Sequence, residues 1–129
     1  MKIIITTDSK LLHTRLLAIL SSIPRLEIVA EGKSIDETLT LNKIFEPDVL
    51  ILSFHNYDST AFRKLHDLKS KDDRPVIIVL TGNPNSQYLT KWSEAGADYT
   101  FDLAIQFNQM VDVLGELLDK NLYGLKQTI

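Results

Sequence analysis

Polar residues with the chemistry to bind or transfer groups follow the apolar runs of this 129-residue chain. Thr7 and Asp8 follow the first run, Ser53 follows the third, and Thr81 follows the fourth. Carboxylates are the oxygen ligands that Mg²⁺ prefers, and hydroxyls can donate a hydrogen bond to a ligand oxygen. Together these four residues offer one carboxylate and three hydroxyls. We expect a site with little charge, and Asp8 is equally well interpreted as a residue near the start of a helix.

Other combinations that could carry catalysis or hold a metal are weaker. Ser53, His55 and Asp58 contain the residue types of a catalytic triad, but they are too close in sequence to act as nucleophile, base and orienting acid. His13, His55 and His66 share no metal-ligand spacing. The chain has no cysteine, which excludes disulfides, thiolate catalysis and cysteine-ligated zinc. The sequence therefore predicts no enzyme, no catalytic residue and no metal site.

The hydrophobic pattern predicts the elements that must position these residues. Apolar runs rich in β-branched residues begin near residues 3, 26, 48, 76 and 98. Three of these runs are continuous rather than alternating, which is typical of strands buried on both faces of a parallel sheet. Helical spacing of apolar residues predicts helices within 12–23, 34–45, 59–71, 85–95 and 107–122. Five strand–helix units with right-handed crossovers predict an α/β fold with a doubly wound, five-stranded parallel sheet. Sites in such sheets lie at the carboxyl ends of the strands.

Composition indicates one globular domain and limits the partners it can bind. The chain is 44% hydrophobic and 24% charged, and 14 Lys and Arg against 17 Asp and Glu give a net charge of −3. Without a basic stripe, we expect no direct nucleic-acid binding. No apolar run approaches the ~20 residues of a membrane span, so we expect a cytoplasmic protein. The predicted domain covers residues 1–122, and residues 123–129 are expected to be a tail or the start of a linker after a stop at Gly124.

The chain resembles the receiver domain of bacterial two-component response regulators, which has a flavodoxin-like fold. The resemblance rests on residues 46–52, 76–82 and 95–99 and extends from Lys2 to about Asn121. Residues 23–32 are similar to the branch whose receivers precede a helix-turn-helix output domain. The resemblance implies a phosphorelay in which a histidine kinase phosphorylates an aspartate, with Mg²⁺ held by three acids and with a hydroxyl residue and a lysine beside the phosphoryl group.

Only two of the five pocket positions that the resemblance implies keep the family's residue type. Asp8 matches the second of the paired acids, whereas Thr7 stands where the first would be. Ser53 occupies the phospho-acceptor position, and Thr81 matches the hydroxyl residue. Leu103 stands in place of the lysine. The resemblance therefore implies a degenerate receiver, or pseudo-receiver.

The missing charges decide what this pocket is expected to do. Each carboxylate beside a cation at ~4 Å contributes about 4 kcal/mol at an effective dielectric constant near 20, before desolvation. Since two carboxylates are replaced, we expect no Mg²⁺ binding and no aspartyl phosphorylation. The aromatic switch position holds Thr100. We therefore expect a phosphorylation-independent signalling module that acts by protein–protein contact and regulates transcription through a fused or separate output domain.

Two alternatives and one possible interface remain open. The turn over residues 6–10 opens a helix, which would suit a flavodoxin-like ligand-binding or phosphate-binding protein. A receiver phosphorylated at an atypical residue, with Asp8 as the candidate, is the second alternative. The resemblance also implies that the fourth helix, fifth strand and fifth helix form a face for a protein partner or a homodimer.

Overall fold

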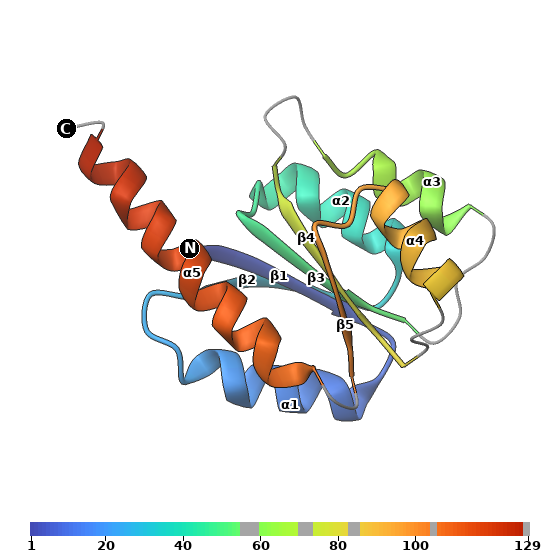
Figure 1. The fold of residues 1–129 in the computed structure, drawn as a ribbon, viewed down its shortest axis with the longest axis horizontal. Coiled ribbons are helices and arrows are strands. Elements are labelled where there is room, and N and C mark those ends of the chain that lie inside the picture. The colour runs from blue at the N-terminus through green and yellow to red at the C-terminus, as the bar shows by residue number, and fades with distance from the viewer. Residues whose placement is uncertain (55–59, 70–73, 83–85, 104–105, 128–129) are drawn as a thin grey trace.

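A computed structural model describes residues 1–54, 60–69, 74–82, 86–103 and 106–127 of the protein, in which strands and helices alternate along the chain (Figure 1). The strands are β1 Lys2–Thr7, β2 Glu27–Gly32, β3 Val49–Ser53, β4 Val76–Thr81 and β5 Tyr99–Asp102. The helices are α1 Lys10–Ser21, α2 Ile35–Phe45, α3 Ala61–His66, α4 Ser86–Glu94 and α5 Phe107–Gln127. The predicted five-stranded α/β fold is confirmed.

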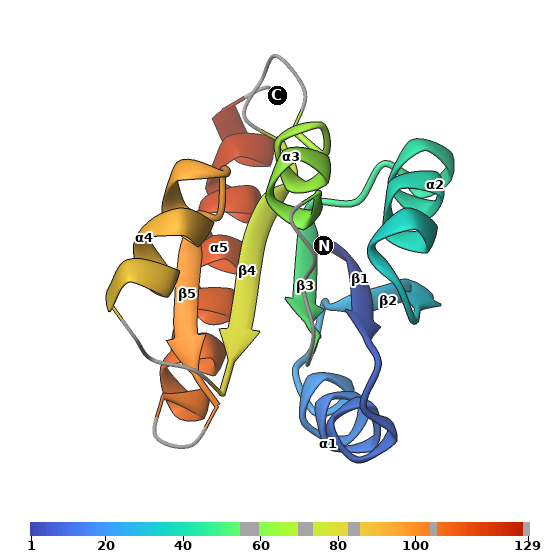
Figure 2. The same ribbon diagram turned by 90° about the vertical axis from the view of Figure 1, so that its right-hand side faces the viewer.

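All strand pairs of the sheet are parallel, and the strand order is β2-β1-β3-β4-β5. Helices α1 and α5 cover one face, whereas α2, α3 and α4 cover the other (Figure 2). Because both faces are covered, the central strands are apolar without alternation: β3 is buried along its whole length.

Successive strand residues supply two separate cores. Ile3 and Ile5 pack into the cluster beneath α1 and α5, whereas Ile4 packs into the cluster beneath α3 and α4. Neighbouring residues of a strand point to opposite faces, so one run of β-branched side chains fills both layers. Trp92 is fully buried in the second cluster, with its ring centroid 4.5 Å from that of Phe62.

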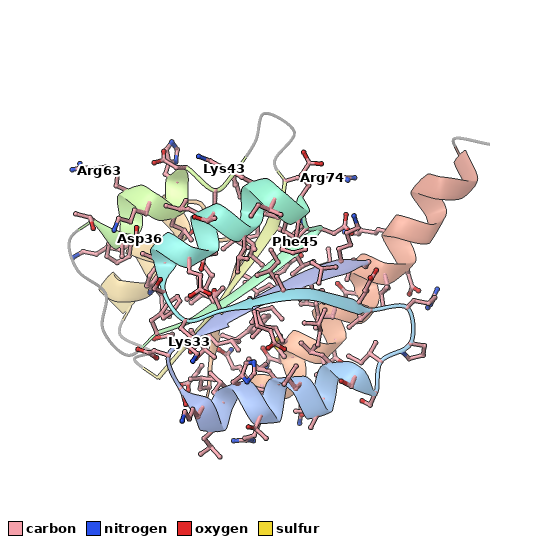
Figure 3. All side chains as sticks on the ribbon, turned by 180° about the vertical axis from the view of Figure 1, so that it is seen from behind. Lys33, Asp36, Lys43, Phe45, Arg63 and Arg74 are labelled. Atoms are coloured by element: carbon pink, nitrogen blue, oxygen red, sulfur yellow. The ribbon has the colours of Figure 1, made fainter. Side chains whose placement is uncertain are left out.

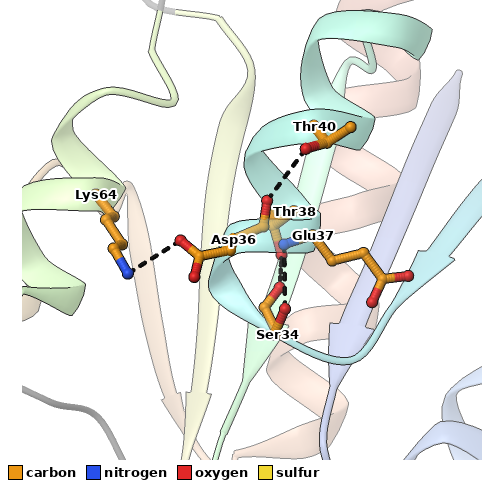
Figure 4. A network of polar contacts seen from close by, with 6 residues as sticks. All are labelled: Ser34, Asp36, Glu37, Thr38, Thr40 and Lys64. Atoms are coloured by element: carbon orange, nitrogen blue, oxygen red, sulfur yellow. Dashed lines mark hydrogen bonds and ion pairs between the residues drawn. The ribbon is translucent and has the colours of Figure 1, made fainter.

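Helix α2 has a well-defined start and end. The Ser34 hydroxyl, at the N-cap, accepts the Glu37 N–H at 3.1 Å. The Glu37 carboxylate accepts the Lys33 N–H at 3.1 Å, one residue before the N-cap, so the arrangement resembles a capping box shifted by one residue. An ion pair of 3.0 Å between Asp36 and the Lys64 ammonium ties the first turn of α2 to α3 (Figure 4). At the other end, Glu46 adopts a left-handed conformation immediately before Pro47.

Two helices differ in length from the prediction. Helix α3 spans Ala61–His66 and is followed by a turn, whereas a helix over 59–71 was expected, of which residues 59, 70 and 71 lie outside the described residues. Helix α5 continues through Gly124 to Gln127, so the predicted helix stop at this glycine is wrong. The division into residues 1–122 and 123–129 stays a prediction, since no break in secondary structure marks it.

The end of α4 agrees with the prediction. Gly96 has a φ of +115°, the left-handed region in which a glycine ends a helix with least strain.

Along the described ranges, no helix combines the length and apolar character that crossing a membrane requires.

Candidate functional site

The carboxyl edge of the sheet brings together the three hydroxyl residues that the sequence singled out. Thr7 pairs directly with Ser53 across β1 and β3, and the Leu103 N–H donates to the Thr81 carbonyl at 2.9 Å where β4 meets the end of β5. The exposed fractions of Thr7, Ser53 and Thr81 are 4%, 6% and 5%. Strand register therefore gathers buried, neutral hydroxyls where the resemblance implies a charged pocket.

The turn between β1 and α1 shows which residue starts the helix. The Ser9 hydroxyl accepts the Leu12 N–H at 3.2 Å, and the Thr7 hydroxyl accepts the Ser9 N–H at 3.2 Å. Ser9, rather than Asp8, is thus the N-cap of α1. Asp8 itself is exposed. The carboxylate matched to the acid pocket therefore lies at the surface of the edge and not among the buried hydroxyls.

The two positions matched on β5 and after it have apolar or neutral surroundings. Leu103 is half-buried and packs against the core cluster beneath α1 and α5. Thr100 is also half-buried and lies between Tyr99 and Phe101, whose rings are nearly parallel with centroids 6.1 Å apart. The Asp102 N–H donates to the Gln106 side-chain oxygen at 2.8 Å, which fixes the start of the loop into α5. The lysine position thus holds an apolar side chain at the margin of the core.

A hollow of about 240 Å³ lies on the same edge, between the β1–α1 turn and the β2–α2 turn. The His13 Nε2 on α1 and a Glu31 carboxylate oxygen on β2 lie 3.1 Å apart and are part of its wall. Lys33 lies on this side of the molecule, while Phe45 marks the opposite end of α2 (Figure 3). The full lining carries both signs of charge: Thr7, Asp8, Ser9, Lys10, His13, Glu31, Gly32, Lys33 and Glu37.

Sequence reasoning missed this hollow because its lining comes from separate elements. His13 and Glu31 are 18 positions apart, and only the pairing of β1 with β2 brings them together. Gly32 also lines this hollow, and the sequence alone gives no reason for a glycine there. A Cβ at this residue would lie 2.8 Å from the Thr6 methyl carbon, so β2 approaches β1 closely here.

The remaining candidates do not assemble into a metal or catalytic site in the described part of the chain. His66 is exposed on α3, and His55 and Asp58 lie outside the described residues. Across the ranges that the structure describes, no group of three or more His, Asp or Glu side chains is arranged to hold a metal ion. At Thr7, Ser53 and Thr81 the available chemistry is therefore hydrogen bonding by neutral hydroxyls, with the Asp8 carboxylate exposed beside them.

Comparison with known proteins identifies the class of fold. No family model matches the chain. A 78-residue segment is 30% identical to a protein-glutamate methylesterase/protein-glutamine glutaminase of Halalkalibacterium halodurans, and this match covers 60% of the chain but only 22% of that protein.

Solved structures match over nearly the whole chain. A two-component response regulator of the LuxR family from Aurantimonas sp. SI85-9A1 superposes with a TM-score of 0.79 at 18% identity, covering 92% of this chain and 85% of that one. The signal receiver domain of a DNA-binding response regulator from Colwellia psychrerythraea 34H gives a TM-score of 0.76 at 20% identity, covering 92% and 98%. The chain therefore has the fold of response regulator receiver domains.

Proposed function

We propose that the protein is a receiver-like signalling module that works through protein–protein contact without phosphorylation of an aspartate. The observation that carries this proposal is the composition of the carboxyl edge. Ser53 is a buried neutral hydroxyl at the matched acceptor position, with Thr7 paired beside it. A phosphoryl acceptor needs a nucleophilic oxygen and cations to neutralise the transferred group.

Electrostatics supports the loss of phosphorylation. Two carboxylates of the matched acid set are hydroxyls here, which removes two attractions of about 4 kcal/mol each for a divalent ion at ~4 Å. Leu103 supplies no positive charge, because its side chain packs into an apolar cluster. Ser53 also has no histidine or carboxylate partner in the motif to activate its hydroxyl. We assign the pocket no cofactor and the protein no catalytic residue.

Without a phosphoryl group, regulation must come from binding. A two-state protein shifts its population only when a ligand binds one state more tightly than the other. The face formed by α4, β5 and α5 is the proposed contact for a partner or an output domain that regulates transcription. Lys91 is exposed on α4, and Tyr99 is half-buried on β5, so this face offers both a charge and an aromatic ring.

The 240 Å³ hollow favours a second candidate, a flavodoxin-like ligand-binding or phosphate-binding protein. Its position beside the start of α1 suits an anion, but Asp8, Glu31 and Glu37 supply three carboxylates that repel one. We therefore place it second. An absorbance spectrum of the purified protein tests for a bound flavin: a flavin band would favour this candidate, and its absence would leave the signalling module.

A magnesium titration tests the proposed function. We expect the backbone amide signals of Thr7, Asp8 and Ser53 in an NMR spectrum of the ¹⁵N-labelled protein to stay in place through millimolar Mg²⁺. The double variant Thr7→Asp/Ser53→Asp restores both carboxylates and is the matched control, in which saturable shifts are expected. Saturable shifts at these amides in the unmodified protein would contradict the proposal.

A further inference from the structure

The hollow at the carboxyl edge is bounded by two neighbouring strand–helix turns and is small. Its volume of about 240 Å³ corresponds to about eight water molecules at ~30 Å³ each, whereas pockets for drug-sized ligands hold about 300–1,000 Å³. Lys33 lies between the starts of α1 and α2 (Figure 3). We call the two sides of the hollow the α1 wall (Thr7, Asp8, Ser9, Lys10 and His13) and the α2 wall (Glu31, Gly32, Lys33 and Glu37). A ligand that fits between them is smaller than a drug-sized molecule.

The α1 wall offers a hydrogen-bond donor and a positive charge. The exposed fraction of Thr7 is 4%, and its hydroxyl oxygen accepts the Ser9 N–H at 3.2 Å. Within the described part of the chain, the proton of this hydroxyl has no acceptor, and a buried donor without an acceptor is destabilising. Lys10 is exposed in the first turn of α1, and its ammonium pairs with no carboxylate among the described residues. This wall therefore suits an anionic group.

The α2 wall carries more negative than positive charge. Its Glu31 and Glu37 side chains are exposed carboxylates, and Lys33 adds one positive charge. The Glu37 carboxylate accepts the Lys33 N–H at 3.1 Å and points away from Asp36 (Figure 4). A hydrogen bond from a backbone N–H leaves the charge of the carboxylate in place. This wall therefore suits a cationic group.

The remaining charged residues of the lining are Asp8 and His13. Asp8 is exposed and already takes part in another interaction, and the His13 Nε2 lies 3.1 Å from a Glu31 carboxylate oxygen. Two lysines and three carboxylates give the lining a net charge of −1 when His13 is neutral, and protonation of His13 brings this charge to zero. A simple anion thus meets three carboxylates, and a simple cation meets two ammonium groups. Neither kind of ion matches both walls.

We propose that the hollow binds a small zwitterion of the α-amino acid class, with its carboxylate at the α1 wall and its ammonium at the α2 wall. The carboxylate of the ligand accepts hydrogen bonds from the Thr7 hydroxyl and the Lys10 ammonium. Its ammonium donates to the carboxylates of Glu31 and Glu37. Because one pair of exposed charges is weak by itself, both ends must be engaged for specific binding. A molecule with only one of the two charges loses one set of contacts and is repelled by the other wall.

This inference deepens the proposed function by naming the class of molecule whose binding replaces phosphorylation as the input, and it rests on that function only for the meaning of the binding. Gly32 and Lys33 line the hollow but lie outside the matched acid pocket, so their amide signals report on the hollow. Magnesium binding at the acid pocket would contradict the proposed function without deciding whether a zwitterion binds. A hollow that binds no zwitterion leaves the argument about the acid pocket unaffected.

An NMR titration of the ¹⁵N-labelled, full 129-residue chain with L-alanine tests the proposal. We expect saturable shifts of the backbone amide signals of Ser9, Gly32 and Lys33. Propionate is alanine without its ammonium group, and ethylamine is alanine without its carboxylate. At the same pH and ionic strength, each of these two ions is expected to bind at least about tenfold more weakly than L-alanine.

Two substitutions that each remove one charge make the test specific to the two walls. Lys10→Gln is expected to raise the dissociation constant of L-alanine about tenfold without weakening the binding of ethylamine, because it removes a cation that repels ethylamine. Glu37→Gln is expected to raise the same constant about tenfold without weakening the binding of propionate. Its amide oxygen remains available to accept the Lys33 N–H. Lys43→Gln and Glu94→Gln replace exposed charges outside the hollow and are the matched controls, which are expected to bind L-alanine unchanged.

Four results would each overturn the proposal. The first is the absence of saturable shifts with L-alanine, and the second is equally tight binding of propionate or ethylamine. The third is L-alanine binding that neither Lys10→Gln nor Glu37→Gln weakens. The fourth is a loss of L-alanine binding in the two controls as large as the loss in these variants, which would show that the hollow does not recognise the ligand by its own charges.

Discussion

At the scale of single residues, the carboxyl edge of the sheet carries neutral side chains at positions where the resemblance to receiver domains implies charged ones. Hydroxyls at Thr7 and Ser53 are compatible with burial because a neutral group costs far less to desolvate than a carboxylate. Leu103 goes further, since it adds apolar contact to the core where the resemblance implies a cation. The edge is therefore better suited to holding the fold together than to stabilising a charged intermediate.

The stability of a Leu103→Lys variant tests this view of the residue. Lysine would lose apolar packing against the cluster beneath α1 and α5, so we expect the free energy of unfolding to fall by about 1–2 kcal/mol. Urea denaturation measures the change. Leu11, whose exposed fraction is 73%, is the matched control, and Leu11→Lys should change stability by less than about 0.5 kcal/mol. Equal effects of the two substitutions would show that Leu103 is not part of the core.

Two glycines with opposite backbone requirements give a second residue-scale prediction. Gly96 has a positive φ, so Gly96→Ala is expected to lower the free energy of unfolding by about 1 kcal/mol or more. Gly115 lies inside α5, and a Cβ there would meet nothing within 4 Å, so Gly115→Ala is expected to raise it by about 0.5–1 kcal/mol. Thermal unfolding measures both. Changes of the same sign would contradict the assigned conformations.

At the scale of elements, the strands were the most predictable part of the fold. Each of the five predicted apolar runs begins within one residue of a strand. The runs are most continuous in the central strands, because burial on both faces selects apolar residues at every position. The end of α5 was not predictable in this way. A glycine inside a helix costs only about 1 kcal/mol, so Gly124 does not by itself end the helix.

The site was less predictable than the strands, because part of it depends on backbone geometry and strand register, which residue types leave open. Thr7, Ser53 and Thr81 could be placed together because parallel strands end at one edge. The choice between Asp8 and Ser9 as the N-cap depended on backbone geometry, which the residue types leave open because both are good caps. The His13–Glu31 pair depended on the register of β1 with β2, which no local pattern encodes.

The N-cap of α2 gives an element-scale prediction. Ser34→Ala removes the acceptor for the Glu37 N–H and is expected to lower the free energy of unfolding by about 1 kcal/mol. Ser93 is exposed within α4, so Ser93→Ala is the matched control and should be neutral or slightly stabilising. Urea denaturation compares the two. A loss of stability in the control as large as that in Ser34→Ala would argue against a specific capping effect.

At the scale of the whole molecule, a complete receiver fold surrounds a pocket with little charge. The two cores on either side of the sheet are continuous, and the fold superposes on receiver structures at 15–20% identity. Under the proposed function, fold and phosphorylation chemistry are separable, because packing depends on the apolar strands whereas metal binding depends on a few carboxylates. The α4–β5–α5 face then becomes the surface by which the molecule is proposed to signal.

The most direct measurement of the central claim is the intact mass of the protein after incubation with a small phosphodonor, such as acetyl phosphate, and Mg²⁺. We expect an unchanged mass, both for the unmodified chain and for Asp8→Asn. A hydroxylamine-sensitive phosphoryl adduct would contradict it, and loss of that adduct in Asp8→Asn would identify Asp8 as an atypical acceptor. An acid-stable adduct that disappears in Ser53→Ala would also contradict the proposed function, because Ser53 would then be a phosphoryl acceptor.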